Sequence, residues 1–135
     1  MGRSTAGSFY YYENTAPTPL SDPSFVLRSG DEDPFVGIEV PGDAFYYSAP
    51  AFGDLDADAD LDLVVGNFYG TIWYFENTGS STSPSFSLTI PGGFEEIPQR
   101  YQASPALGDI DGDLDLDLVL GMSTWGPTYV EGVME

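Results

Sequence analysis

Aspartates at alternate positions open a segment that occurs twice in this chain. The first copy, PAFGDLDADADLDLVVG, begins at Pro50, and the second, PALGDIDGDLDLDLVLG, begins at Pro105, 55 positions later. Carboxylates this close together repel one another, so a fold that gathers them needs a positive partner. An all-oxygen donor set selects a hard divalent cation, calcium before magnesium. The recurrence argues against a chance run of acid and indicates a repeat protein.

Composition narrows the class of protein. The chain has 135 residues, enough for one ordinary domain, and its 41% hydrophobic content is typical of globular proteins despite a net charge of -19. So acidic a surface repels phosphates, which speaks against nucleic acid and anionic lipid as partners. The absence of cysteine and histidine excludes disulfides, zinc–thiolate sites and a histidine base. No apolar run approaches the roughly 20 residues of a membrane span, so we expect no membrane insertion.

Short aromatic and β-branched segments, broken by 16 glycines and 11 prolines, predict an all-β fold. The runs LDLVV and LDLVL are almost wholly apolar, as expected of strands buried on both faces. Two longer segments, 29–46 and 91–102, link the repeated units; they are rich in Gly, Pro and acid and are expected to be loops. Strands are predicted near 8–13, 24–28, 47–53, 61–67, 71–76, 85–90, 103–108, 116–121 and 127–131.

A second pair of repeats gives the order of strands in one unit. GSFYYYENT at 7–15 matches GTIWYFENT at 70–78, and PSFVL at 23–27 matches PSFSL at 84–88. One full unit is therefore a four-stranded antiparallel meander with an aspartate loop between its first two strands. We interpret residues 1–135 as a single repeat array that holds about two units: an outer half at 8–28, a complete unit at 47–90 and an inner half at 103–131.

These residues resemble the FG-GAP and VCBS repeats of integrin alpha-subunit heads, propeller lectins and many bacterial surface proteins. The likeness rests on SAPAFGDLDADADLDLVVG with YGTIWYFENTG, and on ASPALGDIDGDLDLDLVLG, and it extends over most of 7–131. The resemblance implies a β-propeller whose blades are these four-stranded meanders. It also implies calcium in the loop between the first and second strands of a blade, and hence two Ca²⁺ sites per chain.

Carried over position by position, the family's loop supplies alternate ligands. Every second side chain of a tight loop points toward the ion, as in the first half of an EF-hand, and the fourth ligand is a backbone carbonyl. In the family, glycine commonly follows the second and third ligands, where φ tends to be positive. Here those places hold Ala57 and Ala59 in the first loop and Gly112 and Leu114 in the second. The implied metal residues are Asp54, Asp56, Asp58, Asp60 (carbonyl) and Asp62, and Asp109, Asp111, Asp113, Asp115 (carbonyl) and Asp117.

Two other features have a structural and a functional interpretation. The strand aromatics suit packing between blades, with Trp73 and Phe75 on one face; the alternative is that Trp73, Phe68, Tyr69 or Trp125 stacks on a sugar ring. The glutamate and asparagine of each ENT motif suit a turn, with asparagine bonding local backbone. A glycosidase-like glutamate pair is the alternative, but both glutamates come with the repeat.

The expected function is calcium-stabilised binding, not catalysis. The family resemblance suggests an extracellular or cell-surface adhesion module, lectin-like, with a glycan or a surface protein as partner. Two other classes stay open: a purely structural or self-assembling repeat unit, and a polysaccharide-active enzyme.

Self-assembly is also expected. A closed propeller needs roughly four or more blades, and this chain has material for about two. We therefore expect a homo-oligomeric ring, preferably a trimer, in which the two half-units of neighbouring chains combine.

Overall fold

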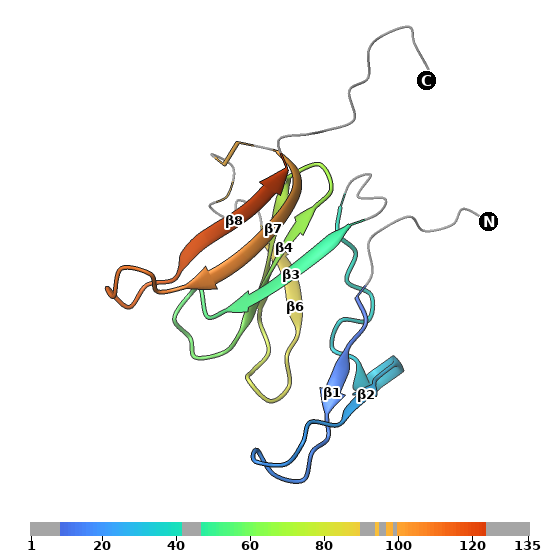
Figure 1. Ribbon diagram of the computed structural model, residues 1–135. Coiled ribbons are helices and arrows are strands. Elements are labelled where there is room, and N and C mark those ends of the chain that lie inside the picture. Colours follow the sequence, from blue (N-terminus) through green and yellow to red (C-terminus); the bar gives the residue numbers. More distant parts are fainter. Residues whose placement is uncertain (1–8, 42–46, 90–93, 95–96, 99, 124–135) are drawn as a thin grey trace, which may run out of the picture.

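The computed structural model describes residues 9–41, 47–89, 94, 97–98 and 100–123. Its regular structure is strands and one short 3-10 helix, so the all-β prediction is confirmed (Figure 1). In this part of the chain, no helix is long and apolar enough to cross a membrane. The predicted strand at 127–131, Trp125 and the outer limits of the predicted units at residues 8, 90 and 131 lie outside the described residues. The elements are β1 (Tyr12–Asn14), β2 (Phe25–Leu27), η1 (Gly30–Glu32), β3 (Ser48–Gly53), β4 (Asp62–Asn67), β5 (Ile72–Asn77), β6 (Phe86–Thr89), β7 (Tyr101–Gly108) and β8 (Asp117–Ser123).

One sheet is complete, with strands in the order β3-β4-β5-β6, each antiparallel to the next. This is the four-stranded meander that the repeats predict. The β4–β5 turn closes through a hydrogen bond from the Gly70 amide to the Asn67 carbonyl, 3.1 Å long. Gly70 lies at φ 83°, a backbone conformation that favours glycine.

The first face of this sheet carries the core. Leu63, Val65 and Phe75 are buried there against Val40. Phe35 stacks on Phe86 with ring centroids 5.3 Å apart, so the segment before β3 covers this face. The sequence predicted that segment only as a loop, because its apolar residues follow no strand or helix period.

The second face of the sheet is packed against β7. A side chain at Gly66 would place its Cβ 2.1 Å from the Ala103 carbonyl oxygen, so only glycine permits this approach. The Gln102 amide donates a 2.8 Å hydrogen bond to the Phe68 carbonyl. β7 begins at Tyr101, two residues before the predicted start, because a register shift between Tyr101 and Ser104 extends the pairing past the irregular Gln102, at φ 58°. The β4–β7 contact thus joins neighbouring repeat units.

The remaining strands form two hairpins, β1–β2 and β7–β8. β1 is shorter than predicted and begins at Tyr12, because its pairing with β2 extends only over Tyr12–Asn14. In Figure 1 the complete sheet lies between the hairpins: β7–β8 lie on one side of β3 and β4, and β1–β2 lie at the lower right.

Candidate metal centres

Each aspartate loop joins two paired strands and is closed by its own carboxylates. In the first loop, Asp54 accepts hydrogen bonds from the amides of Asp58 at 3.1 Å and Ala59 at 3.0 Å. In the second, Asp109 accepts from the amides of Gly112 at 2.7 Å and Leu114 at 3.1 Å. The bond from the fifth residue after the first aspartate, Ala59 or Leu114, is common to both loops, whereas the second bond comes from non-equivalent residues.

The backbone conformation of the loops agrees with the expectation from the sequence. Ala57 and Ala59 lie at φ 64° and 74°, and Gly112 and Leu114 at φ 81° and 78°. These are the four places where positive φ was expected. Because a side chain at positive φ is strained, three of the four residues hold the loop in a conformation that their own type disfavours.

The carboxylates converge in each loop, although with different members. Asp54, Asp56 and Asp58 each offer an oxygen within 4.8 Å of the others; in the second loop the group is Asp109, Asp111 and Asp117. Two oxygens bound to one calcium ion at about 2.4 Å are separated by at most about 4.8 Å, so both groups are compact enough to share an ion. Of the predicted side-chain ligands, Asp62 and Asp113 lie outside these groups.

Asp62 is held by the strand that follows it in the sheet. Its carboxylate accepts from the Leu55 amide at 3.0 Å, the Tyr74 hydroxyl at 3.1 Å and the Asn77 amide at 2.8 Å, and it is only 1% exposed. Burial, followed by the hydrogen bond to Asp62, raises the pKa of Tyr74, so this hydroxyl stays a donor. Asp62 thus ties the loop to β5.

Asp117 is the equivalent of Asp62 in the second loop, and one of the three hydrogen bonds of Asp62 has a counterpart there. Asp117 accepts from the Ile110 amide at 2.9 Å, the counterpart of the Leu55 bond. The sequence analysis did not assign the Tyr74 hydroxyl or the Asn77 backbone amide as partners of Asp62. Both recur in the repeats, as Tyr11 and Asn14, and that recurrence was the available signal.

The fourth aspartate of the first loop points elsewhere. Asp60 is buried and lines a cavity of about 260 Å³ with Tyr11, Phe35 and Asn77. Its Oδ1 has no hydrogen-bond partner among the described residues. The Asp60 carboxylate is not part of the group that Asp54, Asp56 and Asp58 form, and the resemblance implies the backbone carbonyl of Asp60 as the ligand.

The electrostatics of the first loop favour a cation. Burial, then the neighbouring Asp58 carboxylate, raises the pKa of both Asp56 and Asp60. In the part of the chain that is described, both ion pairs belong to Arg28, which bonds Glu13 and Glu32 away from the loops. The donor set of clustered carboxylates without a basic partner fits a hard divalent ion.

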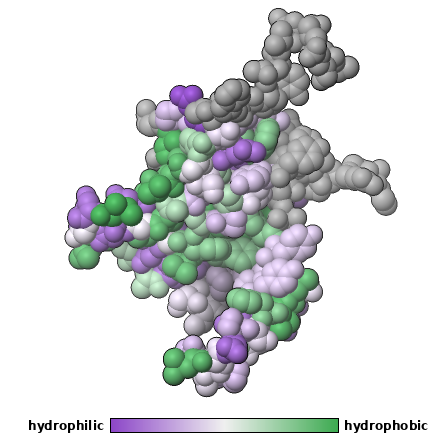
Figure 2. Space-filling view, in the orientation of Figure 1, coloured by the Kyte–Doolittle hydropathy of each residue, from purple (hydrophilic) through white to green (hydrophobic). Residues whose placement is uncertain are grey.

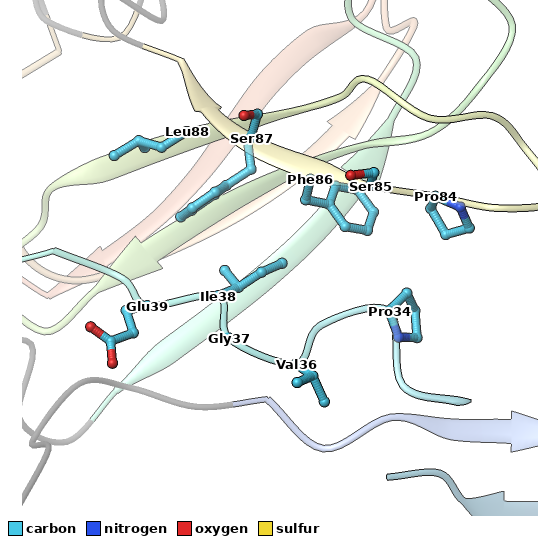
Figure 3. A pocket seen from close by; sticks show the side chains of 11 residues that line it. Pro34, Val36, Gly37, Ile38, Glu39, Pro84, Ser85, Phe86, Ser87 and Leu88 are labelled. Atoms are coloured by element: carbon cyan, nitrogen blue, oxygen red, sulfur yellow. The ribbon is translucent and has the colours of Figure 1, made fainter. Parts of the chain in front are cut away.

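A groove lies apart from the loops, between residues 34–39 and β6. Its cavity of about 460 Å³ is lined by Ile38, Phe86 and Leu88 beside the polar Glu39 and Ser85 (Figure 3). None of the aromatics considered for sugar stacking is among its lining residues. Trp73 packs against the core cluster instead.

The turns after β1 and β5 have the predicted role for asparagine. The Asn14 side chain accepts from the amides of Ala16 at 3.1 Å and Ser24 at 2.9 Å. Asn77 accepts from those of Gly79 at 3.1 Å and Ser85 at 2.9 Å. This equivalence supports the interpretation that the β1–β2 and β5–β6 hairpins are copies of one motif.

Comparison with known families matches residues 54–120, both aspartate loops included, to the FG-GAP-like repeat. This segment is an FG-GAP-like repeat. The predicted resemblance is thereby confirmed, and the FG-GAP-like repeat agrees with the antiparallel sheets as a β-propeller-type module. No curated protein and no solved structure matches the chain.

Proposed function

We propose that this chain is a calcium-stabilised β-propeller module that binds a partner and does not transform it. The observation that carries the proposal is that the equivalent loops of two repeats each bring three carboxylate oxygens within 4.8 Å of one another. Calcium at each loop would join the strands on either side of it. Because an ion bound only by the folded chain stabilises by mass action, a site filled at 100 times its dissociation constant adds about 2.7 kcal/mol.

The exposure of the loops bears on where such a module works. Asp56, Asp58, Asp109 and Asp111 are all exposed, and several of their oxygens already accept backbone amides. A site of this kind suits weak binding, with dissociation constants on the order of 10⁻⁴–10⁻³ M, as in extracellular modules. We therefore assign the module to the cell surface or the extracellular space.

The groove beside β6 is the proposed partner site. It combines apolar side chains with exposed serines where residues 34–39 lie against β6 (Figure 3). Such a mixture suits a glycan, whose rings pack on apolar surface while their hydroxyls bond polar groups. The net charge of -19 favours a neutral glycan over an acidic one.

Melting experiments test the calcium part. Two filled sites should raise the melting temperature by roughly 10 °C or more over calcium-free buffer. Asp56→Asn and Asp111→Asn should each remove part of that gain, whereas the exposed Asp22→Asn, outside both loops, should retain it. Equal melting curves with calcium and with chelator would refute calcium binding.

A glycan array, with and without calcium, tests the partner part. Leu88→Arg places a charge in the groove and should abolish glycan binding. Leu20→Arg adds the same charge at an exposed position outside the groove and should leave binding unchanged. If the wild-type chain binds no glycan, the structural alternative replaces the lectin-like one.

A further inference from the structure

The two hairpins are complementary parts of one sheet. β1 pairs with β2 as Tyr12↔Leu27 and Asn14↔Phe25. The repeat alignment converts these pairs to Phe75↔Leu88 and Asn77↔Phe86, which are the pairs that join β5 to β6. The first hairpin therefore has the geometry of the third and fourth strands of a complete unit.

The second hairpin corresponds to the other half. β7 pairs with β8 as Leu107↔Leu118 and Gly108↔Asp117. Their equivalents, Phe52↔Leu63 and Gly53↔Asp62, join β3 to β4. Because both hairpins keep the register of the complete sheet, the β4–β5 pairing defines how β8 would meet β1.

Both hairpins expose side chains that the complete sheet buries. Val119 is 54% exposed, whereas its equivalent Val64 is 0% exposed. Tyr12 is also 54% exposed, whereas its equivalent Phe75 is 3% exposed. Apolar surface appears at the lower right of Figure 2, where Figure 1 draws β2, whose three residues are all exposed. Among the described residues, β8 pairs with β7 and β1 pairs with β2, and neither has a strand assigned on its other edge. A strand edge with apolar flanks is a template for another strand.

We propose that β8 of one chain pairs with β1 of a second copy of the same chain. The two hairpins then form one four-stranded sheet, β7-β8-β1-β2, across the interface. The register follows from β4–β5, where Leu63 faces Phe75 and Val65 faces Trp73. In the shared sheet Leu118 therefore faces Tyr12, and Leu120 faces Tyr10.

The partner strand comes from a second copy because the complete sheet separates the two hairpins of one chain. β7 packs on the second face of that sheet at Gly66. Phe35, in contact with Tyr11 at 5.8 Å between ring centroids, packs on the first face. β8 and β1 thus lie on opposite faces of the complete sheet, and the head-to-tail contact repeats from chain to chain until a ring closes.

The second copy also completes the second aspartate loop. In the complete sheet Asp62 accepts from the Tyr74 hydroxyl and the Asn77 amide. Their equivalents across the interface are the Tyr11 hydroxyl and the Asn14 amide, which would both donate to Asp117. This step rests on the proposed calcium function, since it makes the second site dependent on assembly; the strand pairing itself does not.

Cysteine cross-linking tests the register, because the chain has no cysteine of its own. Facing residues in an antiparallel pair lie about 4.5–5.5 Å apart at Cα, within disulfide range. Tyr10→Cys and Leu120→Cys, each in a separate full-length chain, should form a covalent dimer when the two chains are co-expressed and oxidised. Neither variant alone should do so. The control pairs Leu120→Cys with Tyr11→Cys, whose side chain lies on the opposite face of the strand.

The outcomes separate the two proposals. A cross-link specific to Tyr10→Cys with Leu120→Cys supports the shared sheet; no cross-link, or an equal yield from the Tyr11→Cys control, overturns it. With both cysteines in one chain, a covalent ring whose mass is a multiple of 14.6 kDa, preferably three copies, is expected. An internally bridged monomer would overturn the inference. A specific cross-link in a protein whose melting temperature is the same with and without calcium would support the shared sheet and overturn the proposed calcium sites.

A hydroxyl deletion tests the completed loop. Tyr11→Phe should weaken calcium binding at the second loop about tenfold in the assembled protein and leave the first loop unchanged, whereas Tyr74→Phe should do the reverse. Both are read by calcium titration of the native particle. Equal titrations of Tyr11→Phe and wild-type protein would show that Tyr11 takes no part in the second site.

Discussion

Leu114 is the residue whose replacement most directly tests the loop geometry. It lies at φ 78° and its side chain is 89% exposed, so it contributes strain and little packing. Left-handed backbone costs a residue with a Cβ about 1–2 kcal/mol. Glycine removes that cost but adds about 0.4–1 kcal/mol of unfolded-state entropy. Leu114→Gly should therefore yield a net gain of about 0.5–1 kcal/mol.

The free-energy gain of Leu114→Gly can stabilise the calcium-free fold or strengthen calcium binding, so both free energies are measured. Denaturant unfolding without calcium gives the first part, and calorimetric calcium titration gives the second. If all of it reaches the binding step, affinity rises by roughly a factor of two to five. For each variant, the change in the free energy of unfolding and the change in the free energy of calcium binding are added.

Gly112→Ala is the matched control. It lies at φ 81°, and a Cβ built there meets no atom within 4 Å. Its effect is therefore confined to the backbone and should have the opposite sign, a loss of up to about 1 kcal/mol. If Leu114→Gly raises neither stability nor affinity, the loop does not need positive φ at this position and the strain argument is wrong.

Three further predictions concern the core and the loop electrostatics. Gly66→Ala should destabilise the chain by about 2–3 kcal/mol in denaturant unfolding, because the new Cβ meets the Ala103 carbonyl; an unchanged midpoint would contradict the β4–β7 packing. Tyr74→Phe should cost about 1.5–3 kcal/mol in calcium-free buffer, since it removes a donor from the buried Asp62 carboxylate. The raised pKa values of Asp56 and Asp60 mean that the folded chain binds more protons than the unfolded chain above the ordinary aspartate value of 3.8. Their contribution to stability is thus lost as pH rises through the folded pKa values. Asp56→Asn should therefore make the melting temperature in calcium-free buffer depend less steeply on pH. Calcium should oppose this loss, because it binds ionised carboxylates; the same pH slope for wild type and variant would exclude the effect.

Local features of this protein could be predicted from its sequence. Alternation in a strand depends only on neighbouring residues, so Trp73 and Phe75 were correctly placed on one face. The positive φ at Ala57 and Leu114 was implied by the resemblance of the loops to the family's pattern. The antiparallel order of β3 to β6 was predictable because its short connections leave few other pairings.

Contacts between distant segments were decided by the tertiary structure. The apolar residues of 34–40 carry no periodic signal, and only packing shows that Val40 and Phe35 cover the sheet. The hydrogen bond from Tyr74 to Asp62 depends on the register of β4 against β5, and the same register sets how closely β7 approaches Gly66. The grouping of Asp117 with Asp109 and Asp111, without Asp113, depends on how the loop closes in space. Spacing along the chain limits which side chains can meet, but the packing of strands selects which of them do.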